Sequence, residues 1–93
     1  MKTITLQIGN SDDKLTQCEW SLFVGTVEND IRKRRANWHF SGLSRGDASW
    51  QNACWVLEME PEEIELLKVD LTATRQAYNQ DSVAITEGQT AFV

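Results

Sequence analysis

The stretch Leu15-Thr16-Gln17-Cys18-Glu19-Trp20 carries the start of a helix, and the order of the elements on either side of it decides the fold. The Thr16 hydroxyl is placed to accept a hydrogen bond from the Glu19 backbone, and the Glu19 side chain is placed to reach back to Thr16, which is the capping-box pattern. Leu15 and Trp20 occupy the two positions of a hydrophobic staple around this cap. The stretch therefore predicts a helix preceded by a loop.

The segments next to this cap predict a strand before it and a long helix after it. Thr3–Ile8 alternates polar and apolar residues, as a half-buried strand does. The helix should run to about Arg35, because one apolar stripe follows it: Trp20, Phe23, Val24, Val27 and Ile31. We interpret the basic run Arg32-Lys33-Arg34-Arg35 as a complement to the helix dipole in preference to a phosphate-binding patch.

The second half of the chain repeats the pattern of strand and helix. Asn37–Ser41 predicts a short strand and Trp50–Met59 a longer one. Glu60-Pro61-Glu62-Glu63 predicts a second helix start, with proline at the first helical position and acids in the first turn. Its core stripe is Ile64, Leu67, Leu71 and Tyr78. Ser82–Thr86 predicts the last strand.

The order strand, helix, strand, strand, helix, strand predicts an α+β fold of the ferredoxin-like type. In that βαββαβ arrangement, two helices cover one face of a four-stranded antiparallel sheet. A turn at Glu87-Gly88 into a final ribbon through Phe92 remains an open addition. The 93 residues make one globular domain, 1–93. We expect its tryptophans to supply much of the core: Trp20, Trp38, Trp50 and Trp55.

Composition argues against several function classes. The net charge of −5 opposes nucleic-acid binding, which needs a clustered positive face. No apolar run approaches the roughly 20 residues of a membrane span, and Met1–Gly9 does not resemble a signal peptide, so we expect a cytoplasmic protein with reduced thiols. With three Cys and His residues in total, we expect no zinc site and no cofactor. Carboxylates in the loops leave a hard-cation site open: Asp12, Asp13, Asp47 and Asp81.

The predicted topology gathers three polar loops on one edge of the sheet: Gly9–Thr16, Ser41–Gln51 and Asn79–Ser82. Amides, hydroxyls and both charge signs suit a polar ligand or a protein contact, although turns use the same residue types for local reasons. Both interpretations stay open. The candidate binding residues at this edge are Asn10, Ser11, Asp12, Lys14, Arg45, Gln51, Asn52, Gln80, Asp81 and Ser82.

One pair of residues carries a catalytic alternative. Alternation puts Trp38 and Phe40 into the core and leaves His39 on the uncovered side of the sheet, where Cys54 also lies. If the hairpin is symmetric, His39 stands directly across from Cys54, close to the reach of a thiol–imidazole pair. A small Cys–His enzyme is therefore the alternative to a binding protein.

Three short segments resemble small uncharacterised proteins of actinobacteria and their phages. They are Gln7-Ile8-Gly9-Asn10-Ser11-Asp12-Asp13-Lys14-Leu15-Thr16, Trp50-Gln51-Asn52-Ala53-Cys54-Trp55 and Gln80-Asp81-Ser82. The resemblance brings no activity and no catalytic residue with it. It implies a phage or accessory protein, in which binding of a protein partner or a small polar ligand is a common role. We therefore expect a non-catalytic binding protein.

A second apolar stripe on each predicted helix indicates self-association. Cys18 and Leu22 lie opposite the core stripe of the first helix, and Leu66, Val69 and Ala73 lie opposite that of the second. The outer side of a helix packed on a sheet is normally polar, and exposed apolar patches often mark interfaces. The sequence thus predicts a homodimer that pairs through its helices.

Overall fold

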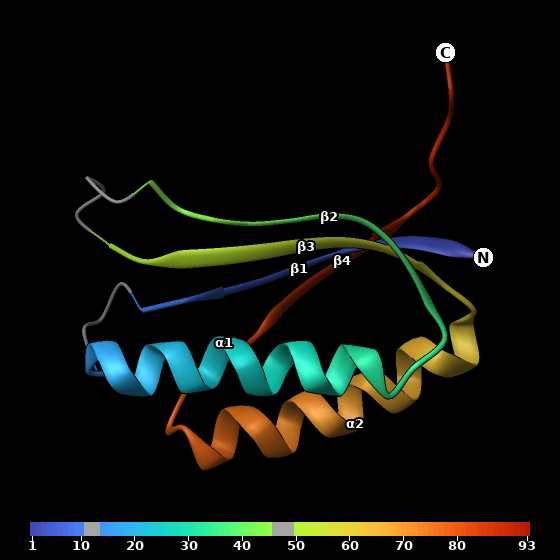
Figure 1. Ribbon diagram of the computed structural model, residues 1–93. Helices are drawn as coiled ribbons and strands as arrows, with labels where there is room; N and C mark the ends of the chain where they lie inside the picture. Colours follow the sequence, from blue (N-terminus) through green and yellow to red (C-terminus); the bar gives the residue numbers. More distant parts are fainter. Residues whose placement is uncertain (11–13, 46–49) are drawn as a thin grey trace.

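The structure, a computed structural model, describes residues 1–10, 14–45 and 50–93. The elements follow the predicted order: β1 Lys2–Gly9, α1 Gln17–Arg32, β2 Ala36–Leu43, β3 Asn52–Met59, α2 Pro61–Ala77 and β4 Ala84–Gly88. The strands form one antiparallel sheet in the order β2-β3-β1-β4, and both helices cover the same face of it (Figure 1). The predicted ferredoxin-like α+β fold is confirmed. No helix in the described part of the chain is long and apolar enough to cross a membrane.

The helix starts form as their sequences predict. The backbone N–H of Glu19 donates to Thr16 Oγ1 at 3.2 Å, and the backbone N–H of Thr16 donates to Glu19 Oε1 at 3.0 Å. This capping box starts α1, which ends at Arg32, three residues earlier than predicted. Pro61 begins α2. After α2 the chain turns at Asn79, whose φ of 56° is the left-handed conformation that asparagine tolerates at this position.

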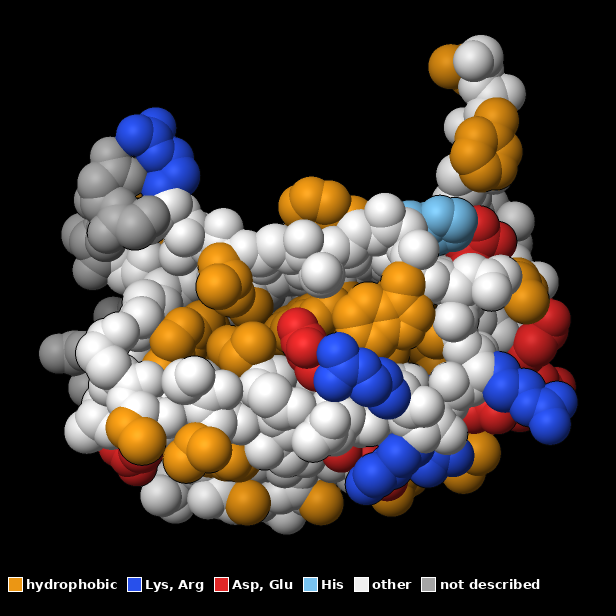
Figure 2. All heavy atoms as spheres, viewed as in Figure 1, with side chains coloured by type: hydrophobic (Ala, Val, Ile, Leu, Met, Phe, Trp, Pro, Cys, Tyr) orange, Lys and Arg blue, Asp and Glu red, His pale blue; other side chains and the backbone are white. Residues whose placement is uncertain are grey.

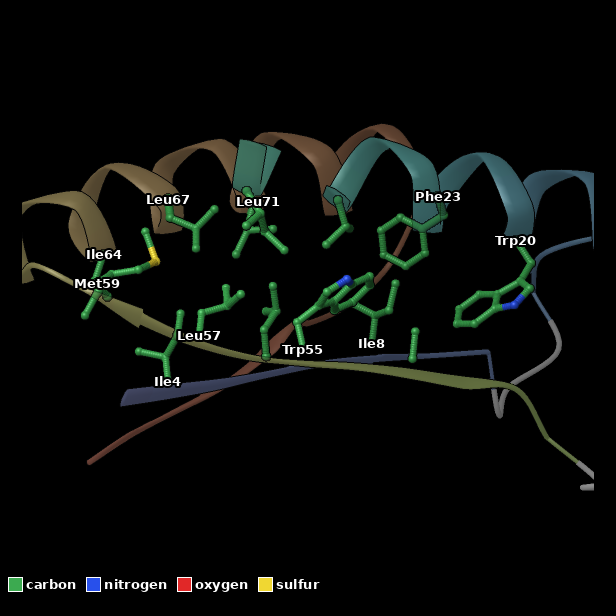
Figure 3. Close-up of a cluster of buried hydrophobic side chains, with 14 of the residues drawn as sticks. Ile4, Ile8, Trp20, Phe23, Trp55, Leu57, Met59, Ile64, Leu67 and Leu71 are labelled. Atoms are coloured by element: carbon green, nitrogen blue, oxygen red, sulfur yellow. The ribbon is translucent and has the colours of Figure 1, made fainter. Parts of the chain in front are cut away.

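The core lies between the sheet and the two helices (Figure 3). Every second residue of β1 and β3 faces the helices, which in turn contribute one stripe each. The buried set includes Ile4, Leu6, Ile8, Phe23, Val27, Ile31, Trp55, Leu57, Met59, Ile64, Leu67 and Leu71. Trp20 and Trp55 are buried, whereas Trp38 and Trp50 are 39% and 55% exposed. Two of the four tryptophans therefore belong to the core, and the expectation for the other two is wrong.

Polar contacts pair the two helices in antiparallel fashion. The Thr74 hydroxyl donates to Asp30 Oδ2 at 2.5 Å, and both residues are buried. Arg34 Nη2 donates to Asp70 Oδ2 at 2.8 Å at one end of the helix pair. Toward the other end, the hydroxyls of Thr26 and Tyr78 lie 2.9 Å apart. These contacts fix which parts of α1 and α2 are neighbours.

The last strand is shifted by two residues from the predicted Ser82–Thr86: it begins at Ala84 and ends at Gly88. Glu87 and Gly88, expected as a turn, continue β4 and pair with Ile4 and Thr3 of β1. Glu87 lies 3.0 Å from Lys68 Nζ, and this contact lowers the pKa of Glu87 and raises that of Lys68. The ion pair favours strand over turn at Glu87. Residues 89–93 form no strand, so the chain has no terminal ribbon; they rise from the sheet on the side opposite the helices (Figure 1).

A β-bulge in β2 reverses the expected orientation of one aromatic residue. Trp38 lies opposite Leu57 and Phe40 opposite Val56, so His39 is the extra residue. Leu57 faces the helices, whereas Val56 faces away from them, on what we call the open face of the sheet. Phe40 therefore lies on the open face, 57% exposed, and its predicted place in the core is wrong. The bulge shifts the alternation by one residue, which no period-2 pattern anticipates.

Candidate functional site

The structure separates the two residues of the catalytic alternative. Cys54 pairs with Gly42 of β2 and Gln7 of β1, not with His39. His39 Nε2 instead lies 2.6 Å from Glu58 Oε1. Because Cys54 and Glu58 are four residues apart on one strand, His39 is bound roughly 13 Å away from the position of Cys54. The predicted cross-strand pair is wrong because the hairpin is not symmetric about residues 46 and 47: Cys54 lies opposite Gly42, three residues after His39.

The predicted loop edge is real, and Asn10 is its structural centre. Its side-chain N–H donates to the Leu15 carbonyl at 3.0 Å, and its Oδ1 accepts from the Leu15 N–H at 3.0 Å. The Asn10 backbone N–H donates to the Gln51 carbonyl at 2.8 Å, which ties the end of β1 to the start of β3. Asn10 is 4% exposed. Its amide is fully engaged in holding the loops, so it is a structural residue of this edge.

Other predicted binding residues at this edge also hold the loops together. Gln51 exchanges hydrogen bonds with Gln17 of α1, with Gln51 Nε2 donating to Gln17 Oε1 at 2.8 Å. Gln80 is buried and donates to the Tyr78 carbonyl at 3.2 Å. Lys14 Nζ lies 3.4 Å from Asp81 Oδ2, which joins the loop after β1 to the loop before β4. The three predicted loops thus meet through their own side chains.

Some of the remaining predicted site residues lie on the surface of the described part of the chain, and others lie outside the described residues. Asn52 and Ser82 line a hollow on the open face, described below, and Arg45 is exposed in the connection between β2 and β3. Ser11 and Asp12 lie outside the described residues, as do Asp13 and Asp47 of the suggested cation site. Among the residues that the structure describes, no group of three or more His, Cys, Asp or Glu side chains lies close enough to hold a metal ion.

A hollow of about 450 Å³ opens on the open face beside the loop edge. Its walls come from all four strands and from the residues next to them. The described lining residues are Gln7, Ile8, Gly9, Phe40, Gly42, Leu43, Ser44, Asn52, Ala53, Cys54, Ser82 and Ala84. All of them are uncharged, although the chain carries a net charge of −5. The hollow therefore offers amides, hydroxyls, a thiol and one aromatic ring to an uncharged group.

Two glycines make this hollow. A Cβ atom at Gly42 would lie 2.8 Å from Cζ of Phe40, so the phenyl ring rests directly on the Gly42 backbone. A Cβ atom at Gly9 would lie 2.7 Å from Oδ1 of Asn52, so the amide of Asn52 occupies the space above Gly9. Any larger residue at either position has to displace a wall of the hollow. These glycines hold the aromatic ring and the amide in place.

The space-filling view shows the shape of the open face. The face forms the upper surface of the molecule in Figure 2, and the segment 89–93 stands up from its right end. The hydroxyl of Thr90, the second residue of this segment, contacts the hydroxyl of Thr3 of β1. Thr3 lies at the end of β1 away from the hollow. The hollow and the segment are therefore at opposite ends of one sheet face.

Another hollow, of about 240 Å³, lies between β2 and α1. Its lining includes Val24, Leu43 and Trp55, and Figure 2 shows apolar side chains along this gap. Trp38 borders the same gap at 39% exposure, with the Arg32 guanidinium 5.8 Å from its ring centroid. Since β2 is an edge strand, we attribute this hollow to incomplete cover of the sheet by α1.

The predicted dimer residues are exposed but do not form one patch. Leu22, Leu66 and Val69 are 58%, 48% and 67% exposed, and Cys18 and Ala73 are exposed as well. In the antiparallel helix pair, however, Thr26 meets Tyr78 and Arg34 meets Asp70. Leu22 and Leu66 therefore lie near opposite ends of the helix layer, roughly 24 Å apart along the helix axes.

Comparison with known proteins does not identify the chain. No protein-family model matches it, and a search of curated proteins finds no match. The resemblance to actinobacterial and phage proteins accordingly stays a prediction.

Proposed function

We propose that the chain is a non-catalytic binding protein that receives an uncharged segment of a protein partner in the hollow of its open face. The observation that carries this proposal is the uncharged lining of the hollow in a strongly acidic chain. Surface charge keeps an acidic protein apart from most other macromolecules, and a neutral concave area is the place where another chain meets the least repulsion. A partner segment is held there by its shape and by hydrogen bonds.

The side chains of the hollow define which groups suit it. The phenyl ring of Phe40 offers an aromatic surface to a second ring or an apolar side chain. The amides of Gln7 and Asn52 and the hydroxyl of Ser82 line the same space and are able to orient a peptide or amide group. This mixture of an apolar wall with a few polar groups is typical of ligand sites. A small uncharged polar molecule is the alternative occupant.

The wider setting of this function is also a proposal. Cys54 lies in the hollow and Cys18 on α1, and both cysteines are free, which suits the reducing cytoplasm. An accessory role in a phage or its host fits a small protein that acts by binding.

A minimal probe tests the proposed site. N-acetyl-phenylalanine amide carries an uncharged aromatic side chain between two amide groups, and its binding is measured by ligand-observed NMR. We expect binding in the millimolar range, as befits a fragment. N-acetyl-phenylalanine with a free carboxylate should bind more weakly, since the hollow lacks a cation among its described lining residues. Equal binding of the two probes contradicts the proposal.

A pair of glycine variants provides the matched control. Gly42→Val fills the hollow and displaces the Phe40 ring, so it should abolish binding of the neutral probe. Gly88→Val adds the same atoms to the same sheet face, but no atom lies within 4 Å of its Cβ position. It should leave binding unchanged. If both variants bind like the wild-type chain, the hollow is not the site.

A further inference from the structure

The segment 89–93 carries a large apolar side chain into solvent. Phe92 is 86% exposed, and the segment stands away from the sheet on the open side (Figures 1 and 2). The hydroxyls of Thr3 and Thr90 hold its beginning on the open face. An exposed phenylalanine on an ordered extension has nothing of its own domain to pack against, and it presents the kind of group that the hollow suits.

Symmetry relates this segment to the hollow. In the arrangement that relates them, two copies stack with their open faces toward each other. A two-fold axis lies between the two sheets and is perpendicular to the strands. This operation reverses the strand direction and keeps each β4 over the other. The end of β4 at Gly88 then lies over the end at Ala84 of the second copy, where Ser82 and Ala84 line the hollow. Each copy thus places its segment over the hollow of the other.

The dimensions agree with this arrangement. Stacked sheets lie about 10 Å apart, and the four extended residues from 89 to 92 span roughly 13 Å. The segment is therefore long enough to cross the space between the sheets and insert Phe92. Phe92 does not reach the hollow of the same copy, because that hollow lies at the other end of the strands and the segment rises away from the sheet.

The open face carries no charge at its centre that would repel a second copy, and its area is large enough for a specific interface. The side chains of the open face are uncharged at the centre of the sheet, where Thr5 pairs with Val56 and Thr86. Glu58 is already partnered by His39. Four strands of this length cover roughly 450–500 Å² in each copy. Two such faces and two inserted phenyl rings bury roughly 1,200–1,500 Å², which reaches the lower range of specific protein interfaces.

We infer that the partner of this site is a second copy of the chain, and that each copy inserts Phe92 into the hollow of the other. The inference rests on the proposed function, because it names the occupant of the same hollow. The dimer forms through the open faces of the sheets, and the helix layers remain on the outside.

Sedimentation of the full chain and its variants tests this inference. The wild-type chain should sediment as a dimer at about 100 µM. Phe92→Ala and Gly42→Val should each raise the dissociation constant roughly 100-fold or more, since each dimer loses two buried ring contacts. The double variant Leu22→Glu/Leu66→Glu changes only the outer helix surface and should leave the dimer intact.

Mixing the two interface variants adds a test that a general loss of structure does not reproduce. Phe92→Ala keeps an intact hollow, and Gly42→Val keeps an intact segment, so a heterodimer regains one of the two contacts. It should therefore form at lower concentration than either variant's homodimer. The inference is contradicted if the mixture is still monomeric at a concentration about ten times or more above that at which the wild-type chain forms its dimer.

The remaining outcomes separate this inference from the proposed function. A wild-type chain that is monomeric at about 1 mM overturns the inference, as does a dimer that only Leu22→Glu/Leu66→Glu disrupts. If N-acetyl-phenylalanine amide still binds to the wild-type chain and not to Gly42→Val, the hollow receives a different partner and the proposed function stands. If the probe binds neither to the wild-type chain nor to the Phe92→Ala variant, the inference and the proposed function both fail.

Discussion

Replacing Thr74 by valine should destabilise the fold by about 2 kcal/mol, because it leaves a buried carboxylate without its best donor. The Thr74 hydroxyl donates to Asp30 Oδ2 at 2.5 Å, and the two residues are 7% and 4% exposed. The other oxygen of Asp30 has Lys33 Nζ at 3.9 Å, which is too long for a good hydrogen bond. Valine keeps the shape of threonine, so the loss is that of a hydrogen bond to a charged group, roughly 1.5–3 kcal/mol.

Urea denaturation measures this loss, and Thr72→Val is its control. Thr72 lies on the same helix but is exposed, and its hydroxyl donates to the Lys68 carbonyl. Both substitutions change helix propensity equally, so the difference between them isolates the contact with Asp30. A difference of about 2 kcal/mol corresponds to a fall in Tm of roughly 10 °C for a domain of this size. A difference below about 0.5 kcal/mol refutes the reasoning.

Three further predictions follow from local features. Deleting His39 should cost no more than about 1 kcal/mol in urea denaturation, since it removes one surface contact and leaves Phe40 opposite Val56; a loss above about 3 kcal/mol contradicts the bulge. Gly25→Ala should raise the free energy of unfolding by roughly 0.5–1 kcal/mol, because Gly25 lies within α1 and no atom is within 4 Å of its Cβ position; a loss of stability contradicts this. The hydrogen bond from the Thr16 backbone lowers the pKa of Glu19 below its ordinary value of 4.5, so the contribution of this cap should be present above that pH and disappear as the pH falls through the lowered pKa. Carboxyl ¹³C NMR checks it, and a Glu19 that titrates at or above 4.5 is the contrary result.

The sequence predicts the order and type of the elements because each is encoded locally. The cap at Thr16, the proline at Pro61 and the alternation of Thr3–Ile8 each follow from contacts within a few residues. The end of β4 does not, since Glu87 and Gly88 are in the strand through their pairing with Ile4 and Thr3 of β1, which are distant in sequence, and Glu87 also contacts Lys68 of α2. Trp38 stays 39% exposed because it lies on the edge strand β2, which α1 does not cover completely. Trp50 precedes β3 and belongs to no strand, so the alternation of a strand does not direct it into the core.

The site was only partly predictable. The loop edge followed from topology, but several of its polar residues serve to join the loops. Of the predicted binding residues that the structure describes, only Asn52 and Ser82 line the hollow. Phe40 was missed because its orientation depends on the bulge at His39. The spacing of Phe40 and Gly42, an aromatic residue two positions before a glycine in one strand, is the feature from which the hollow could have been suspected.

A map of amide chemical shifts in the ¹⁵N-labelled Phe92→Ala variant, whose hollow no Phe92 ring occupies, during titration with N-acetyl-phenylalanine amide tests most directly whether the open face binds an uncharged aromatic group. The largest shifts should cluster around the hollow, at Gln7, Gly42, Cys54 and Ala84, which come from four different strands. The outer helix residues Leu22, Leu66 and Val69 should not respond. Shifts confined to the helix layer, or no shifts up to about 10 mM probe, contradict the claim that the open face is the binding surface.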